Sequence, residues 1–177
     1  MKIKDDILFK VTNIDIKNDT FKISDNIKEI GVSAFYQCTN LQNITIPDSV
    51  KIINSNAFSY CTNLKTVRIS NNVEIINRNA FVNCRSLQSI MISKSVKEIC
   101  IYTFYNCESL QSIMIPDSVK SIRLGAFWNC KQLQSITIPK HIQLTEMRNS
   151  FNQNTNQKCI VYHNDKKYTV EDILLYF

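Results

Sequence analysis

Residues 41–61 read LQNITIPDSVKIINSNAFSYC, and residues 64–84 repeat the same arrangement as LKTVRISNNVEIINRNAFVNC. Equivalent positions recur with a 23-residue step, which continues without insertion or deletion through five copies. A fixed period of this length is the sequence signature of a protein built from stacked repeats. Three of the in-phase columns hold one residue type throughout: Phe35, Phe58, Phe81, Phe104 and Phe127; Cys38, Cys61, Cys84, Cys107 and Cys130; Leu41, Leu64, Leu87, Leu110 and Leu133.

Each unit combines two hydrophobic periods. Ile44 and Ile46 alternate with polar residues, which predicts a half-buried strand, and a second short extended piece is expected over Val50–Ile53. The stretch Ala57–Leu64 spaces its apolar residues by three and four, as a short helical turn does. One such unit buries too few side chains to offset the entropy of ordering it, so it is stable only when neighbouring units cover its faces.

The 23-residue spacing extends beyond the five clear copies. Phe21 and Ile23 fall in the strand columns one unit upstream, and Cys159 and Val161 fall in them downstream. We therefore expect about seven parallel strands, which at roughly 4.8 Å between neighbours form a ladder about 30 Å long.

A single domain is expected over residues 1–177, with an N-terminal cap over 1–20, repeats over 21–142, and a degenerate repeat with a C-terminal cap over 143–177. The N-terminal cap is predicted to pair VTNIDI with TFKIS around residues 17–20. In the C-terminal cap, CIVYH and KKYTV are predicted to pair across Asn164 and Asp165. Thr169 and Asp172 then have the spacing of a capping box, which predicts a short C-terminal helix.

Composition narrows the class of protein. The chain has 177 residues, 44% of them hydrophobic, with only 2 Gly and 3 Pro, which excludes collagen-like and disordered chains. No apolar run reaches the roughly 18 residues that a membrane span requires. Because no secretory signal precedes the repeats, a cytoplasmic location is expected, with a non-classical route to the cell surface as the alternative.

The pattern L-x-x-I-x-I-P-x-S-V-x-x-I-x-x-x-A-F-x-x-C resembles the BspA-like class of leucine-rich repeats. The resemblance implies an α/β fold, a right-handed solenoid of 23-residue repeats with a parallel strand ladder on its concave face and short helical turns opposite. It also implies binding of macromolecules, since members are often cell-surface adhesins or antigens. The residues that carry it, with their equivalents in the other copies, are Leu41, Ile44, Ile46, Pro47, Ser49, Val50, Ile53, Ala57, Phe58 and Cys61.

The cysteine column is expected to be structural. Equivalent thiols in a ladder sit about 4.8 Å apart with parallel Cβ vectors, whereas a disulfide needs Cβ atoms near 3.8 Å that face each other. A straight ladder also does not supply four ligands converging on a metal. We therefore predict buried, reduced thiols that pack as small hydrophobic groups, with no metal and no cofactor.

Catalysis has little support in the sequence. His141 and His163 are the two histidines, neither lies near a candidate nucleophile, and no common catalytic motif is present. His141 is expected to hydrogen-bond the backbone in a turn. The protein is therefore predicted not to be an enzyme.

The strand residues that point away from the core form the predicted concave binding surface. Most of them are small and hydroxylated, and two methionines lie in the middle with an arginine beside them. Exposed methionine adapts to a partner, and arginine adds charge and specificity. A solvated sheet with tolerated methionines is the alternative, and the proposed contact residues are Thr66, Arg68, Ser89, Met91, Ser112 and Met114.

A second candidate patch lies on the helical side, where Tyr105 and Trp128 share one column and Ile101 and Leu124 share another. Partial burial under adjacent turns is the alternative to a self-association site.

A basic column is also present, made of Lys28, Lys51, Lys97 and Lys120. Glu74 interrupts this column and no aromatic stacking platform accompanies it, which argues against a nucleic acid partner.

The sequence as a whole predicts a non-enzymatic module that binds a protein partner, whose identity it does not reveal. Two alternatives stay open: a surface adhesin or antigen exported without a cleaved signal, and a structural protein that assembles into a homo-oligomer.

Overall fold

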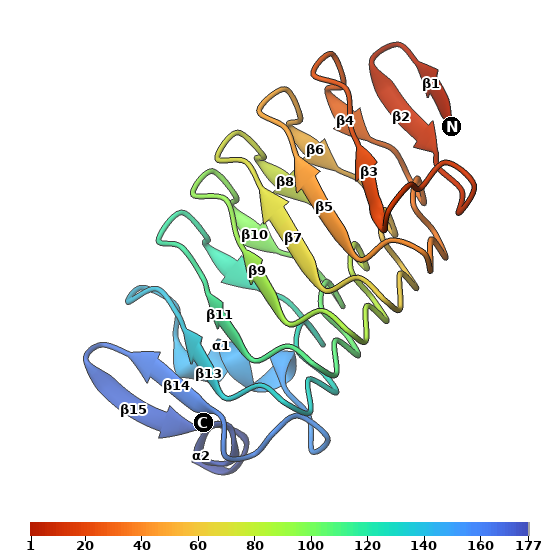
Figure 1. The fold of residues 1–177 in the computed structure, drawn as a ribbon. Coiled ribbons are helices and arrows are strands. Elements are labelled where there is room, and N and C mark those ends of the chain that lie inside the picture. Colours follow the sequence, from red (N-terminus) through yellow and green to blue (C-terminus); the bar gives the residue numbers. More distant parts are fainter. Residues whose placement is uncertain (177) are drawn as a thin grey trace.

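Seven parallel strands and one antiparallel strand form the long sheet of the computed structural model, which describes residues 1–176 (Figure 1). Equivalent residues pair directly, so that Asn43 lies opposite Thr66 and Thr66 opposite Ser89. The predicted seven-stranded ladder is confirmed. In spatial order the strands are β3 (Thr20–Lys22), β5 (Asn43–Ile46), β7 (Thr66–Ile69), β9 (Ser89–Met91), β11 (Ser112–Met114), β13 (Ser135–Thr137), β14 (Ile160–His163) and β15 (Lys166–Thr169).

Two-residue strands form a second ladder behind the first (Figure 1). They correspond to the second extended piece predicted for each unit, and they pair in parallel, each residue with its equivalent in the next unit. One sheet holds β1 (Lys2–Lys4), β2 (Ile7–Lys10), β4 (Glu29–Ile30), β6 (Ile52–Ile53) and β8 (Ile75–Ile76), and another holds β10 (Glu98–Ile99) and β12 (Ser121–Ile122).

The core between the ladders is a continuous column that runs the length of the solenoid. Its centre is the phenylalanine column, whose rings are fully buried and stacked face to face with centroids 4.8 to 5.8 Å apart. Phe151 extends the stack by one ring, 5.9 Å from Phe127. Burial of one large ring in every unit explains why the period tolerates no insertion through these copies.

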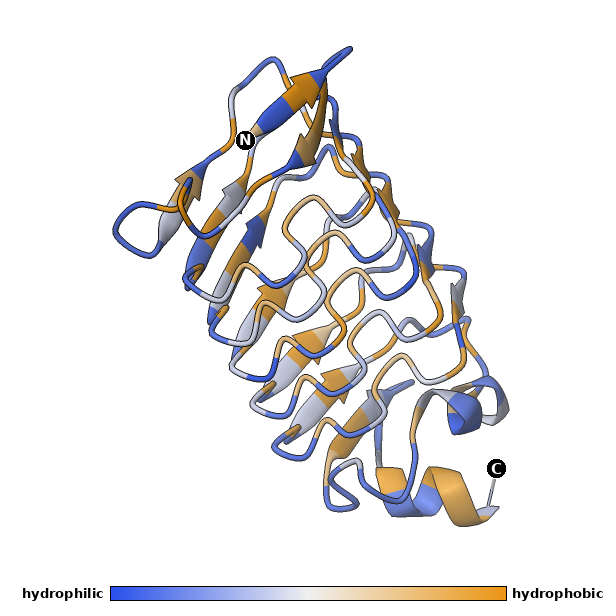
Figure 2. Ribbon diagram, turned by 90° about the vertical axis from the view of Figure 1, so that its right-hand side faces the viewer, coloured by the Kyte–Doolittle hydropathy of each residue, from blue (hydrophilic) through white to orange (hydrophobic). Residues whose placement is uncertain are grey.

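The stretch from alanine to leucine in each unit forms consecutive turns and not a helix. In the second copy, for example, the Cys61 N–H donates to the Phe58 carbonyl at 3.2 Å. Figure 2 looks onto these turns, which stack in register between the two ladders. In the described part of the chain, helices occur only near the C-terminus: α1 (Leu144–Met147), a 3₁₀ turn (Arg148–Ser150) and α2 (Val170–Tyr176).

The column cysteines are buried, as predicted, and they also make a bond that the sequence did not indicate. Each Sγ lies 3.0 to 3.4 Å from a backbone carbonyl of the preceding unit, as Cys84 does from Phe58. After the last clear copy, Thr155 takes the place of the thiol, with its Oγ1 3.0 Å from the Phe127 carbonyl oxygen. One donor per unit therefore links successive coils.

The N-terminal cap differs from the expectation. The hairpin joins β1 to β2 around Asp5 and Asp6, both with positive φ, as a type I′ turn requires. The predicted pairing around residues 17–20 is reduced to a single antiparallel bridge between Lys17 and Thr20. The strand partner of Thr20–Lys22 is instead β5.

The C-terminal coil is longer than the repeat. Ile136 pairs with Val161 and not with Cys159, which the constant repeat period would place opposite it. The assignment of Cys159 to a strand column is therefore wrong, and Val161 occupies the first strand column and not the second, because the α1 helix and the 3₁₀ turn lengthen this coil. The predicted β14–β15 hairpin is confirmed, and so is the capping box, in which Thr169 N–H donates to Asp172 at 2.7 Å.

Candidate binding surface

The ladder face is the set of side chains that the long sheet directs away from the core. Its central residues alternate strictly with buried ones, as in the exposed–buried–exposed pattern of β9 and β11. Met91 is 75% exposed and Met114 is 70% exposed, although methionine is usually buried. Two such side chains at equivalent positions on adjacent strands form an apolar centre on a polar face.

The structure brings together all six ladder-face residues that the sequence proposed. They line one groove of about 550 Å³, in which Arg68 pairs across strands with Met91, and Ser89 with Ser112. Outside the strand columns, the lining also includes Asn71, Lys94 and Pro116, which were missed. They follow the strands, and the turn positions after each I-x-I pair are the signal that would have found them.

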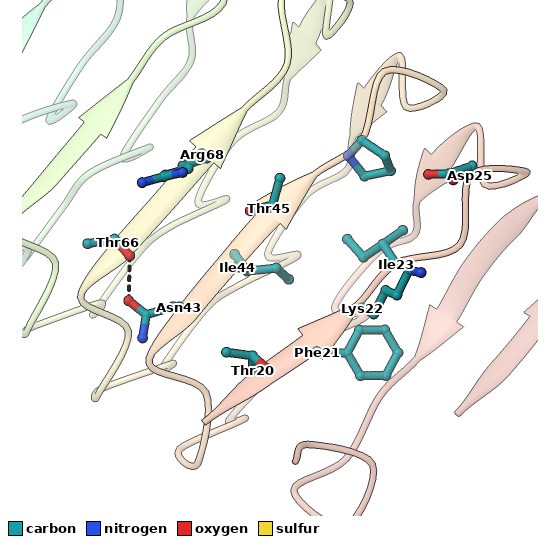
Figure 3. A pocket seen from close by; sticks show the side chains of 11 residues that line it. Thr20, Phe21, Lys22, Ile23, Asp25, Asn43, Ile44, Thr45, Thr66 and Arg68 are labelled. Atoms are coloured by element: carbon teal, nitrogen blue, oxygen red, sulfur yellow. Dashed lines mark hydrogen bonds between the residues drawn. The ribbon is translucent and has the colours of Figure 1, made fainter. Parts of the chain in front are cut away.

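A second depression of about 560 Å³ adjoins this groove at the N-terminal end of the sheet (Figure 3). Its lining includes Lys22 and Thr45, which share strand columns with the proposed residues, and Asp25, which sequence reasoning missed. Thr66 Oγ1 donates to Asn43 Oδ1 at 2.5 Å on its floor. Arg68 lines both depressions, so its guanidinium contributes charge to each.

The aromatic patch on the turn side is brought together only in part. Tyr105 and Trp128 line one groove, whereas Ile101 and Leu124, each 42% exposed, lie outside its lining. Tyr102, which sequence reasoning missed, connects the two aromatic residues through edge contacts of 5.6 and 5.7 Å.

The remaining polar residues have structural roles. His141 Nε2 lies 2.7 Å from the Val119 carbonyl oxygen, which confirms the predicted backbone bond, and His163 is buried beside the Lys140 carbonyl. Lys51, in the basic column, pairs with Glu74 at 3.6 Å, so this column is not a continuous positive stripe.

The thiols lie in surroundings that keep them protonated. Burial raises the pKa of Cys38 to about 11 and that of Cys159 to about 12, and it raises the pKa values of Cys61, Cys84 and Cys107 well above the ordinary value. A thiolate is the nucleophilic and metal-binding form of cysteine. Residues 1–176 contain no cluster of three or more His, Cys, Asp or Glu side chains arranged to hold a metal, and none of their helices has the length and apolar character to cross a membrane.

Comparison with known proteins agrees with this architecture. A family model described as BspA type leucine-rich repeat region matches residues 8–100 and 74–173, with six copies. No curated protein matches the chain.

Solved structures of bacterial leucine-rich repeat proteins are similar to the structure of this chain. A leucine-rich repeat protein of T. pallidum is 29% identical with a TM-score of 0.70, over 79% of this chain and 64% of that one. The pneumococcal vaccine antigen PcpA is 19% identical (TM-score 0.70, 89% of this chain, 38% of that one). A leucine-rich cell surface protein of Faecalibacterium prausnitzii is 20% identical (TM-score 0.50, over 83% of this chain and 59% of that one). The latter two show likeness of fold alone, and the chain spans less than two thirds of each relative.

Proposed function

The chain belongs to the BspA-type leucine-rich repeat family, and from this premise we propose that it is a non-enzymatic module that binds a protein partner on its ladder face. The observation that carries the proposal is the exposure of Met91 and Met114, at 75% and 70%, in one groove with Arg68. Exposed apolar side chains beside an arginine are typical of the centre of a protein interface.

The chemistry of the groove indicates what the partner presents. Methionine side chains are flexible and polarisable, so they adapt to an irregular apolar surface. Arg68 and Lys94 place positive charge around them, without an acidic residue in the same lining. The best partner surface is therefore apolar at its centre with carboxylates at its edge.

The rigidity of the sheet contributes to the affinity. The six proposed contact residues lie on β7, β9 and β11, and each of these strands is paired on both sides. A preorganised backbone loses little conformational entropy on association, so more of the contact energy appears as affinity.

A crosslinking experiment tests the proposal. A photoreactive benzoylphenylalanine is placed at position 91 or, as a control, at position 75, where Ile75 is 44% exposed on the second ladder. A partner captured from position 91 but not from position 75 is purified. The variant Arg68→Ala/Met91→Ala/Met114→Ala is then expected to bind it at least about tenfold more weakly than wild type does.

The matched control is Lys51→Ala/Glu74→Ala/Ile75→Ala, on the second ladder. Equal capture from both positions, or unchanged affinity of the first triple variant with its thermal unfolding intact, removes the proposal.

For the location, we propose the cytoplasm, because the column thiols serve as donors to backbone carbonyls only while they are reduced. The surface alternative draws on the similar structures described as a vaccine antigen and as a cell surface protein. Intact cells treated with an impermeant amine label distinguish the two. Labelling above that of a cytosolic marker supports the surface, and labelling equal to the marker supports the cytoplasm.

A further inference from the structure

Each unit contains two backbone positions in the left-handed region of φ. Asparagine and glycine are the residues that adopt this conformation readily, whereas a bulky side chain there is an outlier. The two columns, with φ between 54° and 65°, are Ser33, Asn56, Asn79, Tyr102 and Gly125, and Gln37, Tyr60, Asn83, Asn106 and Asn129.

Tyrosine occupies these columns twice, and both times it lines the same groove. Tyr60 has φ 61° and Tyr102 has φ 54°, at positions where one neighbouring unit has asparagine, Asn83 and Asn79 respectively. The two side chains come from different columns and from units that are not adjacent, yet they line one space of about 400 Å³. Strained residues that persist against local preference cluster at ligand sites, so this coincidence points to a function.

The packing around Tyr102 is matched to its ring. A Cβ added to Gly125 would overlap the Tyr102 ring, so this ring position requires the glycine of the next unit. The ring then contacts Tyr105 and Trp128 edge-on. The three aromatic side chains form one wall of the groove, and Tyr60 lies two units away.

The rest of the lining is uncharged and, apart from Val82, polar. Its polar members are the amides of Asn56, Asn79 and Asn83. Within residues 1–176, no hydrogen bond engages the side-chain amide of Asn79 or the hydroxyls of the three lining tyrosines, so these groups are available to a ligand. No charged residue lines the groove, although the protein has a net charge of +6.

We propose that this aromatic groove binds a neutral oligosaccharide. The apolar faces of sugar rings pack on aromatic rings, and their hydroxyls both donate and accept hydrogen bonds, as amides and phenols do. The groove crosses four units, roughly 14 Å at the spacing of a strand ladder, which is the length of a short oligosaccharide.

Other occupants fit less well. A second copy of the chain would bury the free amide and hydroxyls against an apolar surface, which is unfavourable because each of these polar groups would lose its hydrogen bonds to water. The volume of about 400 Å³ lies in the range of small-molecule sites. A charged peptide would have no oppositely charged side chain to pair with in the lining of this groove.

The single tryptophan of the chain provides the assay. Because Trp128 lines the groove, intrinsic tryptophan fluorescence reports on this site alone. The probes are cellohexaose, maltohexaose, chitohexaose and mannohexaose, with a charged galacturonate hexamer for comparison. At least one neutral hexaose is expected to give a saturable fluorescence change with a Kd below about 1 mM, and the charged hexamer to bind more weakly.

Substitutions distinguish ligand contacts from structural effects. Tyr102→Asn and Tyr60→Asn introduce the asparagine that one neighbouring unit has at the same position, so each is expected to keep or raise the melting temperature while weakening binding about tenfold. The matched controls Ser33→Asn and Gln37→Asn change the same columns outside the groove and are expected to leave binding unchanged.

Three results would overturn the proposal. One is the absence of any fluorescence change with every neutral hexaose at about 10 mM, far above the affinity expected. Another is equal weakening by the control substitutions. The third is a fluorescence change that follows protein concentration alone together with dimerisation in sedimentation, which would assign the groove to a second copy.

Discussion

Replacement of Cys84 tests whether the thiol column acts as a ladder of hydrogen-bond donors or only as filling for the core. Cys84 is fully buried, and its Sγ lies 3.2 Å from the Phe58 carbonyl oxygen. Three substitutions separate the two roles: Cys84→Ala removes the group, Cys84→Val fills the space without a donor, and Cys84→Thr fills it with one.

The expected free energies of unfolding follow from the structure. Cys84→Ala loses the burial of a group about the size of a methylene and leaves a small cavity, which costs about 1–2 kcal/mol. Threonine and valine have the same shape, so both strain the site equally. Threonine alone donates to the Phe58 carbonyl, as Thr155 is placed to do at Phe127, and should be about 1 kcal/mol more stable than valine.

The assay is urea unfolding followed by far-ultraviolet circular dichroism, with midpoints compared at equal slope. In a purely apolar site valine is more stable than threonine, because the hydroxyl has no partner there. A Cys84→Val variant that equals or exceeds Cys84→Thr in stability would therefore refute the donor role. Thermal unfolding gives an independent check, with about 2–4 °C expected per kcal/mol for a chain of this size.

Two further predictions concern titratable groups. In the native protein Cys100 should react first with a thiol reagent, since it is half-buried while the other six cysteines are buried; peptide mapping showing early modification of Cys84 would contradict this. Hydrogen bonds from the Thr169 N–H and hydroxyl hold the pKa of Asp172 below its usual value. The contribution of the ionised Asp172 carboxylate to folding stability is therefore fully present above its unfolded-state pKa of about 3.9. It is lost as the pH falls through the lower pKa of the folded state. Asp172→Asn should reduce the protection of α2 from hydrogen exchange at neutral pH and remove its dependence on pH in the acid range; identical pH profiles for variant and wild type would exclude the cap.

The repeats could be predicted from the sequence because the period itself determines the contacts. In a stacked solenoid each residue meets its own equivalent in the next coil, so in-phase columns such as Ile44 and Val67 directly predict strand register. The exposure of Met91 and Met114 followed from the same alternation.

The ends and the turns could not be predicted in this way. The last coil is longer than the others because α1 and a 3₁₀ turn replace the short strand, and no column continues through them. Thr155 was missed because its column holds thiols in every preceding unit, although the shared property is a donor. Tyr102 was missed because a column of Ser, Asn, Tyr and Gly shows no hydrophobic period; its Asn and Gly members are the signal for left-handed backbone.

The contacts that hold the coils together join like positions across a constant interval. Phe58 stacks on Phe81, Cys84 donates back to Phe58, and Ile52 pairs with Ile75. Removing or duplicating one whole unit therefore leaves every remaining coil with partners of the same kind. Gene segments that encode one complete unit are the natural steps of gain and loss, and copy number is free to drift during evolution while the cross-section of the solenoid stays the same.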